Sequence, residues 1–269
     1  MNRGDKMDAN WQRLVELLCR SQKLLIFTGA GISTASGIPD FRGPGGVWTR
    51  FRPVTWQEFL ASHQARVAHW EYKLEGWTKF RDARPNAAHQ AVVQLEQAGK
   101  VLLVVTQNID GLHQMAGTSP EKLVELHGTN RWIECVRCGR RCAPEPVFEE
   151  FRQTRQPPRC FCGGWLKPAT ISFGQSLRPE DLEKAWEGAR ACDAVVALGS
   201  SLSVYPAADI PLMAARRGVP YAVINRGPTE HDGRPEVTLR LEGDVSVLFP
   251  ETVRAALGPE AQTPPPTLH

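Results

Sequence analysis

The sequence predicts an α/β fold: a doubly wound parallel sheet with helices on both faces and a small inserted zinc-ribbon and helical lobe. The first observation is that short apolar runs alternate with helical patterns of ten or more residues. The second is that four of these runs end in polar or glycine-rich segments, as the strands of such sheets do where ligands bind. The third is that two stretches interrupt the alternation, which indicates an insertion.

The elements follow in order along the chain. An amphipathic helix is predicted at the start, where Trp11, Leu14, Val15 and Leu18 recur at helical spacing. A helix over 85–99 begins at a proline and ends at a glycine, both common helix boundaries. Two further helices are predicted over 179–192 and 206–218. Buried strands are predicted over 23–28, 100–110, 193–201 and 219–227, a short strand is predicted to end at His127, and the segment 237–245 closes the series.

The interruptions divide the chain into two predicted lobes. Residues 43–85 carry eight of the 21 aromatic residues without a clear strand, and residues 131–169 carry two close cysteine pairs. We expect these two segments to form the small lobe, and residues 1–42, 86–130 and 170–258 to form the large one. The tail, 259–269, is rich in proline and polar residues and is predicted to be disordered.

Charge and hydropathy give no indication of a nucleic-acid or membrane protein. The net charge of +3 over 269 residues does not call for a nucleic-acid or membrane partner. The longest aliphatic runs, such as 101–105, are far shorter than the ~20 residues that cross a bilayer. The N-terminus has no apolar signal core, so a cytoplasmic location is expected.

The segment TGAGISTASGIPDFRG, residues 28–43, suggests a phosphate cradle that departs from the common dinucleotide fingerprint. Thr34 stands where the third glycine is expected, and the usual acid about 20 residues later is missing. Gly29 and Gly31 would let the backbone approach a pyrophosphate, to which the amides of a following helix would donate. A tight strand-to-helix turn is the structural alternative. Asp40, Phe41 and Arg42 add a carboxylate, an aromatic ring and a cation.

The two cysteine pairs predict a zinc site. Cys135 and Cys138 form C-x-x-C, Cys160 and Cys162 form C-x-C, and 21 residues separate the pairs. Four thiolates leave no coordination position for water, so one structural zinc ion is expected. Cys142 is a spare thiol that could replace one of the four.

A further set of polar residues follows predicted strands. His127 comes after a short apolar run, and its ordinary pKa of about 6.5 suits a general base, although a lone histidine is more often structural. Gln107, Asn108 and Asp110 can hydrogen-bond an amide and ribose hydroxyls. No nucleophile elbow or metalloprotease motif is present, so the chemistry is expected to come from a cofactor.

Taken together and in this order, the motifs resemble those of the sirtuin family of NAD-dependent protein deacylases. They are GAGIS with GIPDFRG, TQNIDGLH, ELHG, the two cysteine pairs, GSSLSVYPA and INR, and the resemblance spans about residues 20–250. It implies a Rossmann-like large lobe that holds NAD as a consumed co-substrate. It also implies an acyl-lysine peptide bound between the lobes, near residues 171–175 and 201–207.

The resemblance also implies individual roles. The diphosphate and nicotinamide side would be lined by Gly29, Ala30, Gly31, Asp40, Phe41 and Arg42. The nicotinamide ribose and carboxamide would be held by Gln107, Asn108 and Asp110. The adenosine half would contact Gly199, Ser200, Ser201 and Asn225, with Asp244 and Val245 near the adenine. His127 would be the base, with Asn108 as a second catalytic residue.

The chemistry implied by the resemblance is acyl transfer to ADP-ribose. The acyl-lysine carbonyl oxygen attacks the ribose carbon as nicotinamide leaves, and His127 then takes a ribose hydroxyl proton. The products are free lysine, nicotinamide and O-acyl-ADP-ribose. Sirtuins that prefer acidic acyl groups carry Tyr-x-x-Arg, whereas the nearest match here is Tyr72 followed by Glu75, so a neutral acyl group is expected.

Two alternative functions stay open at the level of the sequence. The same scaffold could transfer ADP-ribose to a protein side chain, since GGVWT and LKPATISFGQ are similar to sirtuin branches with that activity or with long-chain deacylation. A zinc-ribbon nucleic-acid binder is the other alternative, because seven arginines lie between residues 131 and 159.

Overall fold

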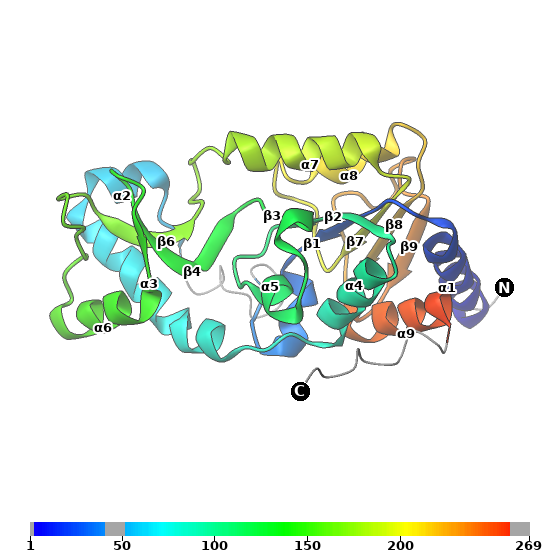
Figure 1. The fold of residues 1–269 in the computed structure, drawn as a ribbon, viewed down its shortest axis with the longest axis horizontal. Coiled ribbons are helices and arrows are strands. Elements are labelled where there is room, and N and C mark those ends of the chain that lie inside the picture. The colour runs from blue at the N-terminus through cyan, green and yellow to red at the C-terminus, as the bar shows by residue number, and fades with distance from the viewer. Residues whose placement is uncertain (1–2, 41–51, 259–269) are drawn as a thin grey trace.

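Two β-sheets organise the structure, a computed structural model that describes residues 3–40 and 52–258 (Figure 1). The larger sheet has six parallel strands in the order β3-β2-β1-β7-β8-β9. The smaller sheet has three antiparallel strands in the order β5-β4-β6. The predicted doubly wound α/β fold with a second, smaller lobe is confirmed.

The strands of the large sheet coincide with the apolar runs of the sequence. They are β1 (Leu24–Thr28), β2 (Val101–Thr106), β3 (Leu123–Glu125), β7 (Ala194–Leu198), β8 (Tyr221–Asn225) and β9 (Leu239–Glu242). Every residue of β1, β7 and β8 is buried, because helices cover both faces of these central strands. The alternating pattern of half-buried strands is therefore absent from them.

Helices form a layer on each face of the large sheet (Figure 1). On one face lie α1 (Arg3–Arg20), α4 (Ala87–Gln97) and α9 (Val245–Leu257), and on the other lie α7 (Pro179–Ala191) and α8 (Asp209–Ala215). Leu14 and Leu18 of α1 pack in the same core as Phe249 and Val253 of α9. The helix α9 was not predicted from the sequence.

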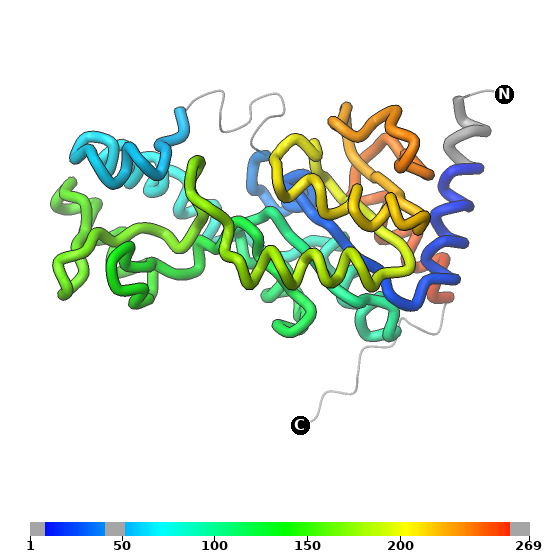
Figure 2. Tube along the Cα trace, turned by 90° about the horizontal axis from the view of Figure 1, so that it is seen from above, coloured from blue at the N-terminus to red at the C-terminus, as the bar shows by residue number. Residues whose placement is uncertain are grey.

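The small lobe has a core of its own and extends away from the large sheet (Figure 2). It contains α2 (Trp56–Ala61), α3 (His63–Asp82), β4 (Gly128–Cys135), β5 (Arg141–Cys142), α6 (Pro144–Thr154) and β6 (Leu166–Thr170). Trp70 and Trp77 of α3 pack with Phe148 and Phe151 of α6. The predicted boundary between residues 130 and 131 falls inside β4, and the division into these lobes stays a prediction.

The chain passes from the large sheet to the small one at His127. β3 ends at Glu125 and β4 begins at Gly128, and the amide of Ile171 donates to the carbonyl of His127 at 2.8 Å. Gly128 has φ +70°, and a Cβ there would lie 2.1 Å from the carbonyl oxygen of Ala169. Only glycine fits at position 128, where the chain enters the small sheet. His127, the preceding residue, therefore lies where the two sheets meet.

The loops after β1 and β7 touch backbone to backbone. The amides of Gly29 and Gly31 donate to the carbonyls of Leu198 and Gly199 at 3.0 and 2.8 Å. A Cβ on Gly31 would lie 2.8 Å from the Cα of Gly199. These glycines are required by the contact between the loops, in addition to any approach of a phosphate.

The helix expected directly after this loop is not formed in the described residues. Two short 3₁₀ turns, η1 (Ala30–Ile32) and η2 (Thr34–Ser36), follow instead and end at Gly37, whose φ is +83°. The amides of Gly29 and Gly31 donate to the carbonyls of Leu198 and Gly199, and the α-helix whose first amides were expected to donate to a phosphate is replaced by these 3₁₀ turns. Within 3–40 and 52–258, no helix combines the length and the apolar character of a membrane span.

Replacing Gly199 with alanine tests the contact between the loops. Gly199 has φ +61°, and its Cβ would lie 2.4 Å from the amide nitrogen of Ile32. We expect Gly199→Ala to lower the free energy of unfolding by about 3 kcal/mol or more, through left-handed strain plus a clash with backbone. Urea denaturation measures this change.

Gly37→Ala is the matched control, because Gly37 has φ +83° but no atom within 4 Å of the added Cβ. This variant should lower the free energy of unfolding only by the cost of a left-handed alanine, about 1 kcal/mol. Equal losses in the two variants would contradict a role for the close approach.

Candidate functional site

The predicted site residues follow strands at one edge of the large sheet. The strand order reverses between β1 and β7, since the chain continues from β1 to β2 on one side and from β7 to β8 on the other. In doubly wound sheets a ligand binds outside the carboxyl ends of the strands at such a switch point. The touching loops of Gly29–Gly31 and Gly199 stand at this point, which separates the site into two halves.

On the β2 side, three buried polar side chains are joined by hydrogen bonds. The amide of Asn108 donates to the hydroxyl of Ser33 and to the carbonyl of Gly29, each at 3.1 Å. Ser33 in turn donates to the Asp110 carboxylate at 2.8 Å. Asn108 and Asp110 were predicted site residues, and the structure brings them together through Ser33.

Burial and hydrogen bonding act in opposite directions on Asp110. Burial raises the pKa of its carboxyl, while the amide of Leu112 at 2.9 Å and the hydroxyl of Ser33 lower it. Nearby Glu125 ends β3, and burial raises the pKa of its carboxyl to about 7. Its Oε1 is buried without a hydrogen-bond partner among the described residues. The charge of Asp110 also raises the pKa of Glu125, so these two acids interact, and burial gives both a reduced tendency to ionise.

His127 is half-buried, and its tautomer follows from its main-chain partner. Its Nδ1 lies 3.0 Å from the carbonyl oxygen of Gln107, which can only accept a hydrogen bond. The neutral ring therefore carries its proton on Nδ1 and its lone pair on Nε2. An imidazole oriented in this way can take up a proton at Nε2.

A side-chain hydrogen bond joins the β7 loop to the β2 loop. Gln107 donates from Nε2 to the hydroxyl of Ser200 at 2.8 Å, and this hydroxyl also accepts from the amide of Leu202 at 3.1 Å. Ser200 is buried, and Ser201 pairs with the hydroxyl of Ser203 at 2.9 Å. Gln107, which also holds His127, thus connects the two halves of the site.

The remaining predicted residues lie further along the same edge. Asn225 ends β8 and is buried, and its amide donates to the carbonyls of the following turn. Asp244 caps α9 and pairs with Arg226 at 2.6 Å, while Val245 is buried in the core. Asp40 is half-buried at the end of the glycine loop. Phe41 and Arg42 lie outside the described residues.

A surface cavity of about 370 Å³ lies away from this edge. Arg13, Leu17, Asp193 and Leu239 are among its lining residues, which belong to α1 and to the opposite ends of the strands. None of the predicted site residues lines it, so it gives no support to their roles.

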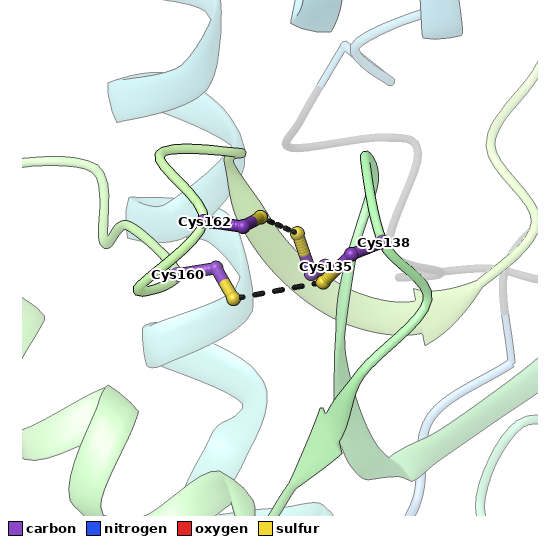
Figure 3. Close-up of side chains that lie close together, drawn as sticks. All are labelled: Cys135, Cys138, Cys160 and Cys162. Carbon is purple, nitrogen blue, oxygen red and sulfur yellow. Dashed lines mark hydrogen bonds between the residues drawn. The ribbon is translucent and has the colours of Figure 1, made fainter.

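The four predicted zinc ligands form a compact group in the small lobe (Figure 3). Their sulfur atoms all lie within 4.8 Å of one another, with Cys135–Cys162 at 3.5 Å and Cys138–Cys160 at 3.8 Å. A tetrahedral zinc ion with bonds of about 2.3 Å places its sulfurs ~3.8 Å apart, so the set fits one ion. Cys142 is not a member of this group.

Comparison with known proteins identifies the family. The sequence profile of the Sir2 family matches residues 29–206. The NAD-dependent protein deacetylase 1 of Bradyrhizobium diazoefficiens is 44% identical over 229 residues, covering 85% of this chain and 90% of that protein. The chain belongs to the Sir2, or sirtuin, family.

More distant Sir2 proteins agree with this assignment. The NAD-dependent protein deacylase 2 of Archaeoglobus fulgidus is 37% identical over 249 residues, covering 92% of this chain and 96% of its own length. A solved Sir2 complex with a deacetylated p53 peptide and 3′-O-acetyl ADP-ribose has a TM-score of 0.83 at 36% identity, covering 90% of this chain and 96% of that one. The sirtuin fold therefore extends over both sheets.

Sequence reasoning did not single out two polar residues, Ser33 and Glu125, that the structure buries near the predicted site residues. Ser33 lies within the quoted GAGIS motif, but its contacts with Asn108 and Asp110 depend on the packing of two loops. Glu125 lies within the quoted VELHG, and only its burial distinguishes it from a surface acid. The motifs contained both residues, and the fold was needed to identify them.

The zinc group yields a testable prediction. Cys138→Ser removes one of four thiolates, so we expect loss of the bound zinc and unfolding of the small lobe, whose core includes Cys135 and Cys160. Metal content per chain and thermal unfolding measure the two effects. Cys142→Ser is the matched control and should keep one zinc ion. Zinc retained by Cys138→Ser and lost by Cys142→Ser would reverse the assignment.

Proposed function

We propose that this sirtuin is an NAD-dependent protein lysine deacylase that transfers an acyl group from acyl-lysine to ADP-ribose and releases nicotinamide. The observation that carries the proposal is the arrangement of His127, with Nδ1 bonded to Gln107, beside the buried Asn108–Ser33–Asp110 cluster at the switch point. The names of the Sir2 relatives, as NAD-dependent deacetylases or deacylases, support it.

The residues present fit NAD. Polar groups lie on both sides of the touching glycine loops, which suits a molecule with two nucleoside halves. We propose that Gln107, Asn108 and Asp110 bind the nicotinamide riboside half. The other half would contact Gly199, Ser200, Ser201 and Asn225, with Asp244 and Val245 near the adenine, and Gly29, Ala30, Gly31 and Asp40 would lie along the diphosphate. Bound NAD supplies a ribose carbon activated by a good leaving group.

The protein's own side chains then position the bound ribose and take up its hydroxyl proton. Asn108 is held by two hydrogen bonds that orient its amide, and Asp110 is held by Ser33 and Leu112. The lone pair on Nε2 of His127 is the proposed proton acceptor. The amide of Ile171 donates to the carbonyl of His127, so the proposed peptide segment 171–175 begins beside the base.

The proposal is tested by product analysis. Purified protein is incubated with NAD and an acetylated peptide, and mass spectrometry follows the peptide and the soluble products. We expect loss of the acetyl group with formation of acetyl-ADP-ribose. His127→Ala should lower kcat/KM by at least about 100-fold, because general-base catalysis contributes this much or more. It should still bind ADP-ribose, as measured by calorimetry.

His63→Ala is the control, since His63 is an exposed histidine at the start of α3. It should keep the activity of the unchanged protein. Full activity in His127→Ala would remove this residue as the base. Gain of ADP-ribose on protein, without loss of the acetyl group, would favour the ADP-ribosyltransferase alternative.

We further propose that the acyl group is neutral. Glu75 is exposed on α3, and an acidic acyl group near its carboxylate would be repelled. Lys73 on the same helix would act in the opposite direction when its amine is charged, because a cation attracts an acidic acyl group. This amine donates to the side chain of Asn130 at 3.2 Å. Burial and the charge of Lys167 lower the pKa of the Lys73 amine to about 7, so above that pH it is mostly uncharged.

Acetylated and succinylated forms of one peptide, assayed at pH 8.5, measure this preference. We expect kcat/KM to be about ten-fold higher for the acetylated form, since two like charges about 4 Å apart near a protein surface repel each other by on the order of 1–4 kcal/mol. A higher value for the succinylated form, lost again in Lys73→Met, would show that Lys73 rather than Glu75 sets the acyl preference.

We also propose a cytoplasmic location, because the cytoplasm keeps thiols reduced and the cysteines of this chain are all free. Fractionation of the native cells, with the protein found outside the cytoplasm, would contradict it.

A further inference from the structure

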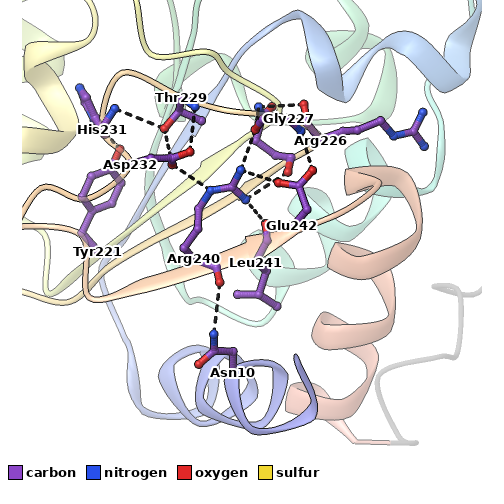
Figure 4. A network of polar contacts seen from close by, with 11 residues as sticks. Asn10, Tyr221, Arg226, Gly227, Thr229, His231, Asp232, Arg240, Leu241 and Glu242 are labelled. Carbon is purple, nitrogen blue, oxygen red and sulfur yellow. Dashed lines mark hydrogen bonds and ion pairs between the residues drawn. The ribbon is translucent and has the colours of Figure 1, made fainter. Parts of the chain in front are cut away.

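Arg240 on β9 uses all five of its guanidinium N–H groups within the large lobe (Figure 4). Its acceptors are Asp232 Oδ1 at 2.9 Å, the carbonyl of Asn225 at 3.1 Å, the carbonyl of Gly227 at 2.7 Å, Glu242 Oε2 at 2.8 Å and the carbonyl of Leu241. The side chain is only 23% exposed. It therefore joins β9 to the segment that follows β8.

Two of the acceptors of Arg240 belong to the turn after β8. Arg240 bonds the carbonyls of Asn225 and Gly227, and Glu242 Oε1 accepts from the amide of Gly227 at 2.7 Å. The Asn225 side chain closes the turn from inside by donating to the carbonyls of Arg226 and Gly227 at 3.1 and 3.0 Å. The orientation of the Asn225 amide thus depends on a turn that Arg240 and Glu242 hold.

The hydrogen bond from Arg240 to Asp232 connects Arg240 to the β7 loop as well. Asp232 accepts from Arg240 and also from the hydroxyl and amide of Thr229, at 2.7 and 3.0 Å. Between them, the amide of Glu230 donates to the carbonyl of Ser201 at 2.9 Å. Arg240 is therefore connected, through one folded segment, to both Asn225 and Ser201.

We propose that Arg240 is a positioning residue that sets the affinity of this protein for the adenosine half of its dinucleotide, by holding Asn225 and Ser201 in place through residues 226–232. This inference rests on the proposed function, which assigns Asn225 and Ser201 to that half. A lysine cannot replace the guanidinium, because its three donors cannot reach five acceptors spread over two segments.

The test uses ADP-ribose as the probe, with binding measured by calorimetry and turnover measured separately. Arg240→Gln should raise the Kd for ADP-ribose and the KM for NAD by about ten-fold, since hydrogen bonds to charged groups are lost. The kcat should not change, because among the described residues no hydrogen bond joins residues 226–232 directly to His127, Asn108 or Asp110. Arg240→Lys should give a smaller increase in the same two constants.

Arg190→Gln is the matched control, since it removes an exposed arginine–glutamate pair on α7 and should leave every constant unchanged. If Arg240→Gln does not fold, Asp232→Asn weakens the same connection and should still raise the Kd for ADP-ribose. An unchanged Kd in the folded variants, or an equal loss in kcat, would overturn the inference. No binding of ADP-ribose by the unchanged protein would instead contradict the proposed function.

Discussion

The contact between the backbones of Gly31 and Gly199 is the constraint on which the rest of the structure depends. Parallel β1 and β7 lie side by side, and their following loops must diverge or touch. They touch, because neither loop carries a Cβ at the contact and Gly199 adopts a left-handed conformation. The polar residues after β2 and after β8 are therefore held on opposite sides of the two touching loops.

The junction between the two sheets is the second constraint, and it depends on the small lobe. His127 lies between β3 of the large sheet and β4 of the small one, and its carbonyl is bonded by the residue after β6. β4 ends at Cys135, and the cysteine group connects this strand to the segment before β6. A zinc ion there would hold the strands that position His127, although it would take no part in the chemistry.

Polar groups in the site are satisfied mainly by one another. Asn108, Ser33 and Asp110 form a chain of hydrogen bonds, and Gln107 bonds both Ser200 and His127. Since buried polar groups without partners are costly, such a cluster is rigid before any ligand binds. Glu125 Oε1 is an exception among the described residues, and burial of that carboxyl raises its pKa.

Sequence by itself determined the strands of the large sheet, the loops that follow them, and the zinc ligands. Continuous apolar runs and cysteine spacings are local patterns, and local patterns specify local structure. Tertiary structure alone decided the neighbours of those loops: the contact of Gly31 with Gly199, the proton on Nδ1 of His127, and the five acceptors of Arg240. Each of these depends on segments far apart in the chain, whose approach is set by packing of the whole sheet.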